Sequence, residues 1–374
     1  MKTPRHHQLR VAEVIVETAD AHSFVLAVPE ELADRFTYRA GQFLTVRIPG
    51  PTGDGFTARC YSLSSSPVDR GDPVDRGDPV DRGDRVGQGD PGNPTGPVDR
   101  RLTITVKRMA DGHGSNWLCD NVTAGSEVQV LPPAGTFTPR TVDADFLLFA
   151  AGSGITPVMS ILRTALIAGT GAVVLVYANR DQPSVIFGAE LDRLVAIHPD
   201  RLRVLHWLET GETGRGLPSA AALRELAAPY ADHEIYVCGP EPFMVEAVQA
   251  AKLLGAPHGR IHVERFVSLA EDPFAVKDEE PAAAGGKLEV ELDGERHQLP
   301  WPATTRMLDV MLDHGLDAPF SCRQGKCAAC TCRLEEGNVT MVHNEVLDAE
   351  DLAEGYILAC QALPVTDTVR ISYE

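Results

Sequence analysis

The chain has 374 residues, of which 43% are hydrophobic, and it carries a formal net charge of −19. This length exceeds one ordinary core and predicts two or three domains of a soluble globular protein. The strong negative charge argues against nucleic acid or an anionic membrane as a partner. The longest apolar runs have the length of a strand, so no membrane span is expected.

Residues 1–140 are predicted to form strands and one helix. The helix is expected from Ser115 to about Cys119, with Ser115 as its N-cap. Free N–H groups at such a helix start suit a phosphate. Short alternating or β-branched segments between Gly, Pro and Asp turns indicate a barrel or a sandwich. These segments are residues 11–18, 23–28, 42–48, 59–64, 102–108 and 127–131.

A six-residue repeat interrupts these strands. The sequence Pro-Val-Asp-Arg-Gly-Asp starts at Pro67, occurs three times without a break and then decays. Three copies with one apolar residue each cannot bury a core. Residues 67–98 are therefore predicted to be a disordered insertion in a loop, without a function of their own.

Residues 141–268 are predicted to form an α/β domain with a doubly wound parallel sheet. The alternation of strands and helices places the ligand beyond the carboxyl ends of the strands. Strands are expected at 145–151, 172–177, 202–207, 234–238 and 260–264, and helices at 158–168, 186–197, 219–228 and 242–254. The first strand leads into the turn Gly152-Ser-Gly154-Ile-Thr156-Pro157. Its N–H groups can meet a pyrophosphate, with Pro157 expected at the first helical position, although Gly-x-Gly alone also fits an ordinary tight turn.

Residues 269–286 are predicted to be a flexible linker, because Pro, Ala, Gly and acidic side chains dominate them. Residues 287–374 are predicted to be an α+β domain, with a strand at 287–292 and a helix at 307–314. They hold 16 Asp or Glu against 7 Lys or Arg. An acidic surface would meet a basic face on a partner protein and speed association, but it also serves solubility alone.

Four cysteines of this last region have the spacing of metal ligands. Cys322, Cys327 and Cys330 follow a C-x4-C-x2-C pattern, and Cys360 follows after 29 intervening residues. This is the spacing of a plant-type [2Fe-2S] ferredoxin. Structural zinc favours two paired arms, and a disulfide framework would suit a secreted chain, so both are weaker interpretations. Cys332 fits no ligand position and is expected to be a buried neighbour. The cysteine usage and the lack of a recognisable signal peptide predict a cytoplasmic protein.

Three further motifs resemble those of the ferredoxin-NADP reductase family. They are Arg59-Cys-Tyr61-Ser62-Leu63-Ser, the turn from Gly152 to Pro157, and Cys238-Gly239-Pro240-Glu-Pro-Phe-Met. Together with the ferredoxin motif, the resemblance covers nearly the whole chain and departs from the family's pattern at the repeat. It implies a multidomain protein with an antiparallel β-barrel that binds FAD, an NAD(P)-binding domain, and a β-grasp [2Fe-2S] ferredoxin domain.

The resemblance also assigns flavin-site residues. Arg59 would bind the flavin pyrophosphate through its planar fork, Tyr61 would lie against the flavin ring, and Ser62 would hydrogen-bond near N5. The Gly112-x-x-Ser115 pattern resembles FAD-binding rather than FMN-binding members. The other residues expected to line the flavin site are Leu63, Val106 and Lys107.

The nicotinamide site and the catalytic residues follow from the same resemblance. Tyr61, Ser62, Cys238 and Glu264 would be the catalytic set, although a strand-end acid such as Glu264 is also consistent with an ordinary carboxylate. The residues expected to bind the nucleotide are Gly152, Gly154, Thr156, Pro157, Gly239 and Pro240. Arg180 could hold the 2′-phosphate of NADPH, whereas Asp181 beside it would repel that phosphate, so NADH is favoured.

The resemblance implies an NAD(P)H-dependent reductase that passes electrons from NADH through FAD and the [2Fe-2S] cluster to a separate Rieske-type terminal oxygenase. That direction is downhill, since plant-type clusters lie near about −400 mV and Rieske centres at roughly −150 to +300 mV. The chain is expected to be a monomer. The alternatives are a reductase serving another kind of oxygenase and a non-catalytic electron-transfer subunit of a larger complex.

Overall fold

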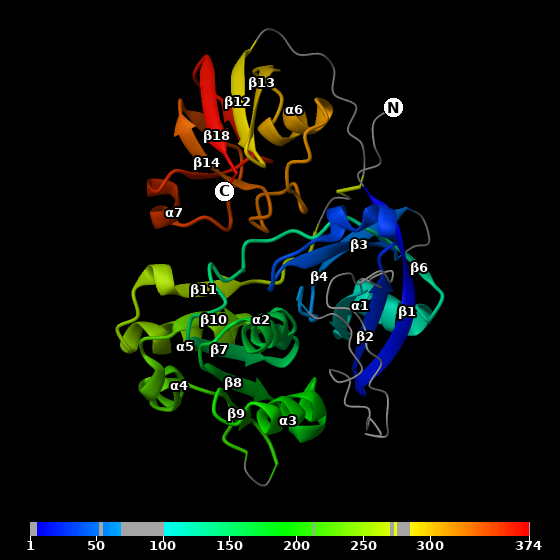
Figure 1. Ribbon diagram of the computed structural model, residues 1–374, viewed down its shortest axis with the longest axis vertical. Helices are drawn as coiled ribbons and strands as arrows, with labels where there is room; N and C mark the ends of the chain where they lie inside the picture. Colours follow the sequence, from blue (N-terminus) through cyan, green and yellow to red (C-terminus); the bar gives the residue numbers. More distant parts are fainter. Residues whose placement is uncertain are drawn as a thin grey trace, which may run out of the picture.

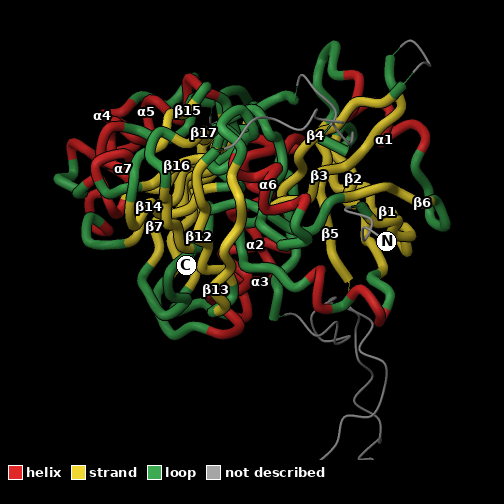
Figure 2. Tube along the Cα trace, turned by 90° about the horizontal axis from the view of Figure 1, so that it is seen from above, coloured by secondary structure: helices red, strands yellow, loops and turns green. Residues whose placement is uncertain are grey.

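The computed structural model describes residues 6–51, 55–68, 101–211, 214–269, 273–274 and 285–373. Nearly all of the predicted repeat insertion and most of the predicted linker lie outside these residues. A barrel and a parallel sheet lie side by side, and a third sheet lies across the end of the molecule above them (Figure 1). Seen from above, strands of this third sheet overlie the parallel sheet (Figure 2). Within the described ranges, no helix has the length and apolarity needed to cross a bilayer.

The barrel is a six-stranded antiparallel sheet in the order β4-β3-β6-β1-β2-β5. A bridge between Leu63 and Ile104 joins its two edge strands. Alternating side chains fill the interior, as the exposure pattern of β1 shows, and helix α1 (His113–Asn121) adds Leu118 to this core. The strands are β1 (His7–Thr18), β2 (Ala21–Ala27), β3 (Phe43–Pro49), β4 (Phe56–Ser62), β5 (Arg101–Lys107) and β6 (Glu127–Val130). The prediction of an antiparallel barrel is confirmed.

The second sheet is parallel, in the order β11-β10-β7-β8-β9. Every residue of its central strands β7 and β8 is buried, because helices α2 and α3 cover one face and α4 and α5 cover the other. Its strands are β7 (Phe146–Ala151), β8 (Val173–Asn179), β9 (Leu202–Leu208), β10 (Glu234–Cys238) and β11 (Ile261–Glu264), and its helices are α2 (Ile155–Ala168), α3 (Gly188–Ile197), α4 (Ala220–Ala227) and α5 (Glu241–Leu253). The doubly wound prediction is confirmed.

The third sheet is mixed, in the order β13-β12-β18-β14-β16, with a separate pair β15-β17. Helix α6 (Met307–Asp313) packs on it around the buried Trp301. This α+β arrangement confirms the predicted ferredoxin-like domain. Its other elements are β12 (Gly286–Leu292), β13 (Glu295–Trp301), β14 (Thr331–Glu336), β15 (Val339–Met341), α7 (Ala349–Ala353), β16 (Tyr356–Leu358), β17 (Ala362–Pro364) and β18 (Thr368–Ser372). Short 3-10 turns at 30–32, 34–36, 152–154, 182–184, 228–230 and 258–260 complete the fold.

Three serines after β4 fasten the barrel to helix α2. Arg163 Nη1 donates to the Ser64 carbonyl over 3.1 Å, and Ser160 Oγ donates to the Ser65 carbonyl over 2.6 Å. The hydroxyls of Ser66 and Thr164 hydrogen-bond at 2.8 Å. Because all of these bonds are buried or partly buried, water competes weakly for them. The barrel is therefore attached to helix α2 of the parallel-sheet domain by the residues that directly follow the predicted flavin-binding strand β4.

Candidate electron-transfer site

Strand β4 carries Arg59, Tyr61 and Ser62, which are predicted to bind flavin, and the start of helix α1 packs against it. The first turn of α1 presses on this strand, since a Cβ on Gly114 would lie 3.0 Å from Arg59 Cγ and 3.3 Å from Tyr61 Oη. A larger residue at this position would require these side chains to shift by a few tenths of an ångström. Arg59 and Tyr61 therefore lie beside the start of the same helix, whose free N–H groups favour an anion. Leu63 and Val106, also predicted for this site, are buried core residues.

The start of α1 differs from the prediction in one detail. Gly112, not Ser115, is the N-cap residue, so the predicted cap is wrong by three positions. Ser115 instead lies inside the first turn, where its Oγ accepts a hydrogen bond from the Met109 N–H at 3.1 Å and donates to the Gly112 carbonyl at 3.2 Å. A Cβ on Gly112 would meet Met109 and the Ser115 hydroxyl. The Ser115 side chain thus ties the first turn of α1 to the segment before it, while Gly112 takes the N-cap position.

The glycine turn after β7 fits tightly against the end of β10. A Cβ on Gly154 would overlap the carbonyl group of Cys238, and one on Gly239 would lie 2.9 Å from the side chain of Ala151. The two predicted nucleotide motifs are therefore neighbours at the carboxyl edge of the sheet, where ligands of such folds bind. Pro157 is the third residue of α2 rather than the first, because the helix begins at Ile155. Thr156 Oγ1 donates to the Ser153 carbonyl, and Pro240 is the N-cap residue of α5.

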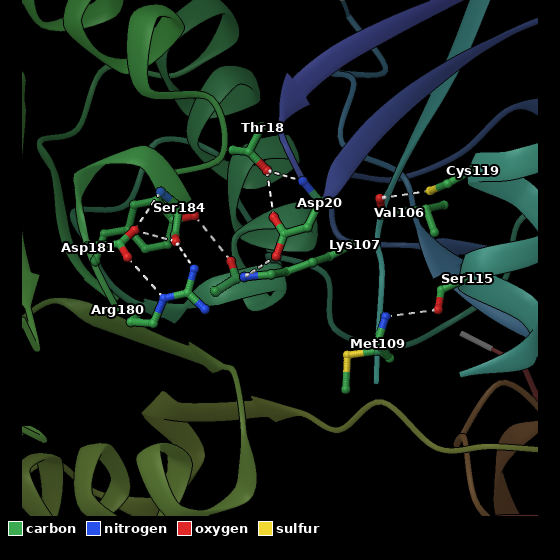
Figure 3. Close-up of polar contacts among 12 residues, drawn as sticks. Thr18, Asp20, Val106, Lys107, Met109, Ser115, Cys119, Arg180, Asp181 and Ser184 are labelled. Carbon is green, nitrogen blue, oxygen red and sulfur yellow. Dashed lines mark hydrogen bonds and ion pairs between the residues drawn. The ribbon is translucent and has the colours of Figure 1, made fainter. Parts of the chain in front are cut away.

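Arg180 and Asp181 are fixed to each other at the end of β8 (Figure 3). The guanidinium of Arg180 contacts the Asp181 carboxylate at 3.0 Å and the Ser184 hydroxyl at 3.0 Å. Asp181 also accepts from the backbone N–H of Ser184 and caps the short turn that follows. These bonds lower the pKa of the Asp181 carboxyl, first through Ser184 and then through Arg180. The Arg180 guanidinium is thus held against the Asp181 carboxylate, which balances its charge.

Lys107, the last residue of β5, lies next to the glycine turn that follows β7. Its Nζ lies 3.7 Å from an oxygen of Asp20, in the β1–β2 turn, and within van der Waals distance of the position a Cβ on Gly152 would take (Figure 3). Gly152 has a φ of +51°, which favours glycine. Its carbonyl accepts a hydrogen bond from Tyr177 Oη at 3.1 Å. A single cation is therefore placed at the junction of the two predicted binding sites.

A small pocket is lined by residues from all three domains. Ser62 of β4, Glu264 at the end of β11 and Cys327 of the cysteine loop line it together, with Phe43, Cys60, Arg265, Phe266 and Val267. Glu264 is the register partner of Cys238 on the neighbouring parallel strand. Two predicted catalytic residues, Ser62 and Glu264, therefore share one pocket, and a third, Cys238, lies next to it. Tyr61 is packed against the barrel core from the same strand.

Burial changes the acid-base properties of this pocket. It raises the pKa of the Glu264 carboxyl to about 8, so this acid is protonated at neutral pH. Burial also raises the pKa of the Cys238 thiol well above its usual range, and the nearby Glu264 adds to this effect. An apolar environment disfavours the charged form of each group. The pocket thus contains one carboxyl poised to hold or release a proton near physiological pH.

The four predicted ligand cysteines come together on one side of the third sheet. Three are buried and Cys327 is half-buried. The backbone N–H groups of Gln324 and Lys326 point at Cys322 Sγ over 3.3 and 3.5 Å. Contacts with the thiols of Cys327 and Cys360, aided by these N–H groups, lower the pKa of Cys322. The loop therefore stabilises a thiolate, the form that binds iron.

The loop backbone is shaped for this role. Arg323, Gly325 and Ala328 all have positive φ angles, between +54° and +73°, which is a costly conformation for the two that are not glycine. In the described part of the chain, no three or more His, Cys, Asp or Glu side chains are arranged to hold a single metal ion. Cys332 lies buried on β14, as predicted.

Several residues around the cysteine loop were missed by the sequence analysis. Gln361 Nε2 donates to Cys360 Sγ at 3.4 Å and to the Arg323 carbonyl at 2.9 Å, and Arg306 donates to the Cys360 carbonyl at 3.2 Å. Arg323 pairs with Asp309 of α6. Such partners orient ligands and tune a metal group. A single amide or arginine near a cysteine forms no recognisable sequence motif. The one hint in the sequence was that Gln361 directly follows the predicted ligand Cys360.

Comparison with known proteins agrees with these observations. Residues 148–250 match the family model described as "Oxidoreductase NAD-binding domain", and residues 290–365 match "2Fe-2S iron-sulfur cluster binding domain". A 3-ketosteroid-9-alpha-monooxygenase ferredoxin reductase component from Rhodococcus rhodochrous is 50% identical over 98% of this chain and 96% of its own. The chain belongs to the ferredoxin-NADP reductase family, in the branch with a carboxy-terminal [2Fe-2S] domain. It is an oxidoreductase with an NAD-binding domain and a [2Fe-2S] cluster-binding domain.

Other relatives show how far the likeness extends. A component of 1,2-phenylacetyl-CoA epoxidase from Escherichia coli is 31% identical over 98% of both chains. Phthalate dioxygenase reductase shares the fold over 98% of both chains, with a TM-score of 0.52 and 21% identity. The flavohaem-like FAD/NAD-binding domain of a nitric oxide dioxygenase from Vibrio cholerae matches 69% of this chain and 97% of its own, with a TM-score of 0.52 and 27% identity.

Proposed function

We propose that this chain passes electrons from NADH, through FAD and the cluster bound by Cys322, Cys327, Cys330 and Cys360, to a Rieske-type terminal oxygenase. The observation that carries this proposal is the pocket lined at once by Ser62, Glu264 and Cys327. It places a predicted flavin residue, an acid and a predicted cluster ligand within one small space. The domain boundaries proposed with it are 1–140, 141–268 and 287–374, with a linker at 269–286.

The residues of the chain have separable roles in this proposal. Arg59 and the start of α1 bind the flavin phosphates, Tyr61 and Ser62 hold the ring, and Lys107 adds a positive charge. Gly152, Gly154, Thr156, Gly239 and Pro240 shape the nicotinamide site. When bound, the flavin accepts two electrons with a hydride, and the cluster takes electrons one at a time. Glu264, protonated at neutral pH, holds the proton nearest to Ser62.

We propose the terminal oxygenase of 3-ketosteroid 9α-hydroxylation as the partner of this reductase. The support is the 50% identity to its reductase components in Rhodococcus rhodochrous and Mycolicibacterium smegmatis, against 31% to the phenylacetyl-CoA system. The acidic ferredoxin domain would dock on a basic face of the oxygenase. The eight cysteines, all free, support a reducing cytoplasm, and the protein would act as a monomer.

One variant tests the electron route. With NADH, the wild-type protein should reduce both a two-electron dye and cytochrome c, whereas Cys327→Ser should keep dye reduction and lose most cytochrome c reduction together with the cluster's visible absorption. The reason is that dye takes electrons from the flavin and cytochrome c takes them from the cluster. Cys332→Ser, in a buried cysteine outside the ligand set, is the matched control.

The outcome separates the possible functions. Full cytochrome c activity in Cys327→Ser would contradict the route through the cluster. If NADH fails to bleach the flavin of the wild-type protein, the chain would be a non-catalytic electron-transfer subunit instead. Mixing the reductase with the steroid oxygenase and with the phenylacetyl-CoA oxygenase, and measuring product, decides between the two partner systems.

A further inference from the structure

The cysteine loop lies directly on the outside of the barrel, against strands β3 and β4. The hydroxyls of Thr45 and Ser321 hydrogen-bond at 2.7 Å, and Cys60 Sγ lies 3.4 Å from Ser321 Oγ and 3.8 Å from Thr45 Oγ1. Thr45 and Cys60 face each other in the antiparallel register of the two strands. We call these three residues the seam. They join segments that lie more than 260 positions apart in the chain.

The seam adjoins both predicted cofactor sites. Cys60 lies between Arg59 and Tyr61, and successive side chains of a strand point to opposite faces. Arg59 and Tyr61 therefore face α1, while Cys60 faces the cysteine loop together with Ser62. Cys60, Ser62 and Cys327 line one pocket. Strand β4 thus presents Arg59 and Tyr61 to α1 within the barrel domain, and Cys60 and Ser62 to the cysteine loop of the third domain.

The surroundings of the seam are dry. Ala58, Leu131, Leu269, Phe274 and Cys322 form an apolar cluster on one side, and Phe43, Ala134 and Ala329 form another. Thr45 and Ser321 each expose 1% of their surface. Burial also raises the pKa of the Cys60 thiol to about 11, so this sulfur is a neutral partner. If one of these hydroxyls were removed, the other would remain buried without a hydrogen-bond partner, because little water reaches it.

Polar contacts at the surface also join the third domain to the other two. Arg35 of the barrel meets Asp317 at 3.1 Å, and His258 of the nucleotide-type domain meets Asp348 at 3.0 Å. The Asp317 side chain is 73% exposed, Arg35 is 34% exposed, and the other two are each 49% exposed. Exposed pairs contribute little to stability. The buried hydroxyl pair is therefore the contact best able to fix the position of the loop.

We propose that Thr45, Cys60 and Ser321 are positioning residues that hold the cysteine loop in place for electron transfer from the flavin. This inference deepens the proposed function, on which it rests. Each transfer moves one electron from the reduced flavin to the oxidised cluster, with no bond formed or broken. After one hydride from NADH, two such transfers and the release of one proton to solvent would return a bound flavin to its oxidised state. When the domains separate, the seam opens and Cys60, which is half-buried in the docked state, becomes more exposed.

The test measures how often the seam opens, without relying on activity. The holoprotein is treated with iodoacetamide, and the modification of Cys60 is followed by peptide mass spectrometry. Cys119, half-buried on α1 and away from the seam, is the internal reference. Thr45→Val removes the hydroxyl with little change in shape, and Thr45→Ser keeps it. Ser321→Ala makes the equivalent change from the other domain.

In Thr45→Val and in Ser321→Ala, Cys60 should be labelled about ten times faster than in wild type. Loss of one buried hydrogen bond is expected to raise the population of the open state by about that factor. Cys119 should label as before. In stopped-flow experiments, NADH should reduce the flavin at the wild-type rate, while electron transfer to the cluster should slow as the docked fraction falls. Thr45→Ser should match wild type in every measurement.

Two results would overturn the proposal: wild-type labelling and cluster reduction in both Thr45→Val and Ser321→Ala, or a Thr45→Ser protein that behaves like Thr45→Val. If Thr45→Val fails to fold or to retain flavin, Ser321→Ala decides, because its change lies outside the barrel. A failure of the proposed function is seen separately. In that case NADH leaves the wild-type flavin oxidised, whereas the labelling comparison remains valid because it requires no electron transfer.

Discussion

The carboxyl of Glu264 should make the stability of the nucleotide-type domain depend on pH. Burial raises its pKa from an ordinary value of 4.5 to about 8. Because the folded state holds this proton more tightly than the unfolded state, its contribution is fully present below pH 4.5 and is lost as pH rises through 8. At 1.36 kcal/mol per pKa unit, the loss reaches about 5 kcal/mol as an upper bound.

The comparison is between wild type and Glu264→Gln, which keeps the shape of the side chain but cannot ionise. Urea unfolding at pH 5, 7 and 9 is followed by fluorescence, to which the buried Trp207 of β9 contributes. With an m-value of roughly 2 kcal/mol per M, the wild-type midpoint should fall by up to about 2 M relative to the variant between pH 5 and pH 9. Signals from the other domains are common to both proteins and cancel in this difference.

An exposed carboxylate provides the control for this experiment. Glu241, at the start of α5, has a side chain that is 60% exposed and pairs with Arg265 at 3.5 Å. Glu241→Gln should therefore follow the wild-type pH dependence. Parallel curves for wild type and Glu264→Gln would refute the reasoning, because they would mean that water or a rearranged pocket already solvates the Glu264 carboxylate.

Two further predictions concern the nucleotide site. Asp181→Ala should raise kcat/KM for NADPH relative to NADH by about tenfold or more, because it removes a negative charge and releases the Arg180 guanidinium; an unchanged ratio in dye-reduction assays would contradict this. Gly154→Ala should raise KM for NADH and lower the thermal midpoint, since its Cβ would overlap the Cys238 carbonyl. Gly259→Ala, where an added Cβ meets nothing, should leave KM for NADH unchanged.

Local patterns predicted most of the architecture. Strands β7 and β8 are buried on both faces, so they appear in the sequence as continuous apolar runs. Strand β1 is buried on one face, so its apolar and polar residues alternate. The cysteine spacing was equally informative, because the loop itself supplies three of the four sulfurs. The error at Ser115 arose because serine is a common N-cap, whereas here a glycine at position 112 takes that place.

Long-range contacts could not be predicted in the same way. Nothing in the residues around Thr45 indicates a hydroxyl partner 276 positions later. Gly114 is one of the two unassigned positions between Gly112 and Ser115 in the predicted motif. Only the structure shows that its small size lets α1 pack closely against Arg59 and Tyr61. Periodicity reports which face of an element is buried, but not which other element covers it.

The serine attachment behind β4 has a consequence for how this protein can vary. The chain leaves the described barrel at Val68 and returns at Arg101, and the bonds from Ser64, Ser65 and Ser66 to α2 come before it leaves. Loop closure costs grow only slowly with length. Insertions of very different length can therefore accumulate at this point without pulling on the flavin strand, and a peptide tag or reporter domain placed there should leave electron transfer intact.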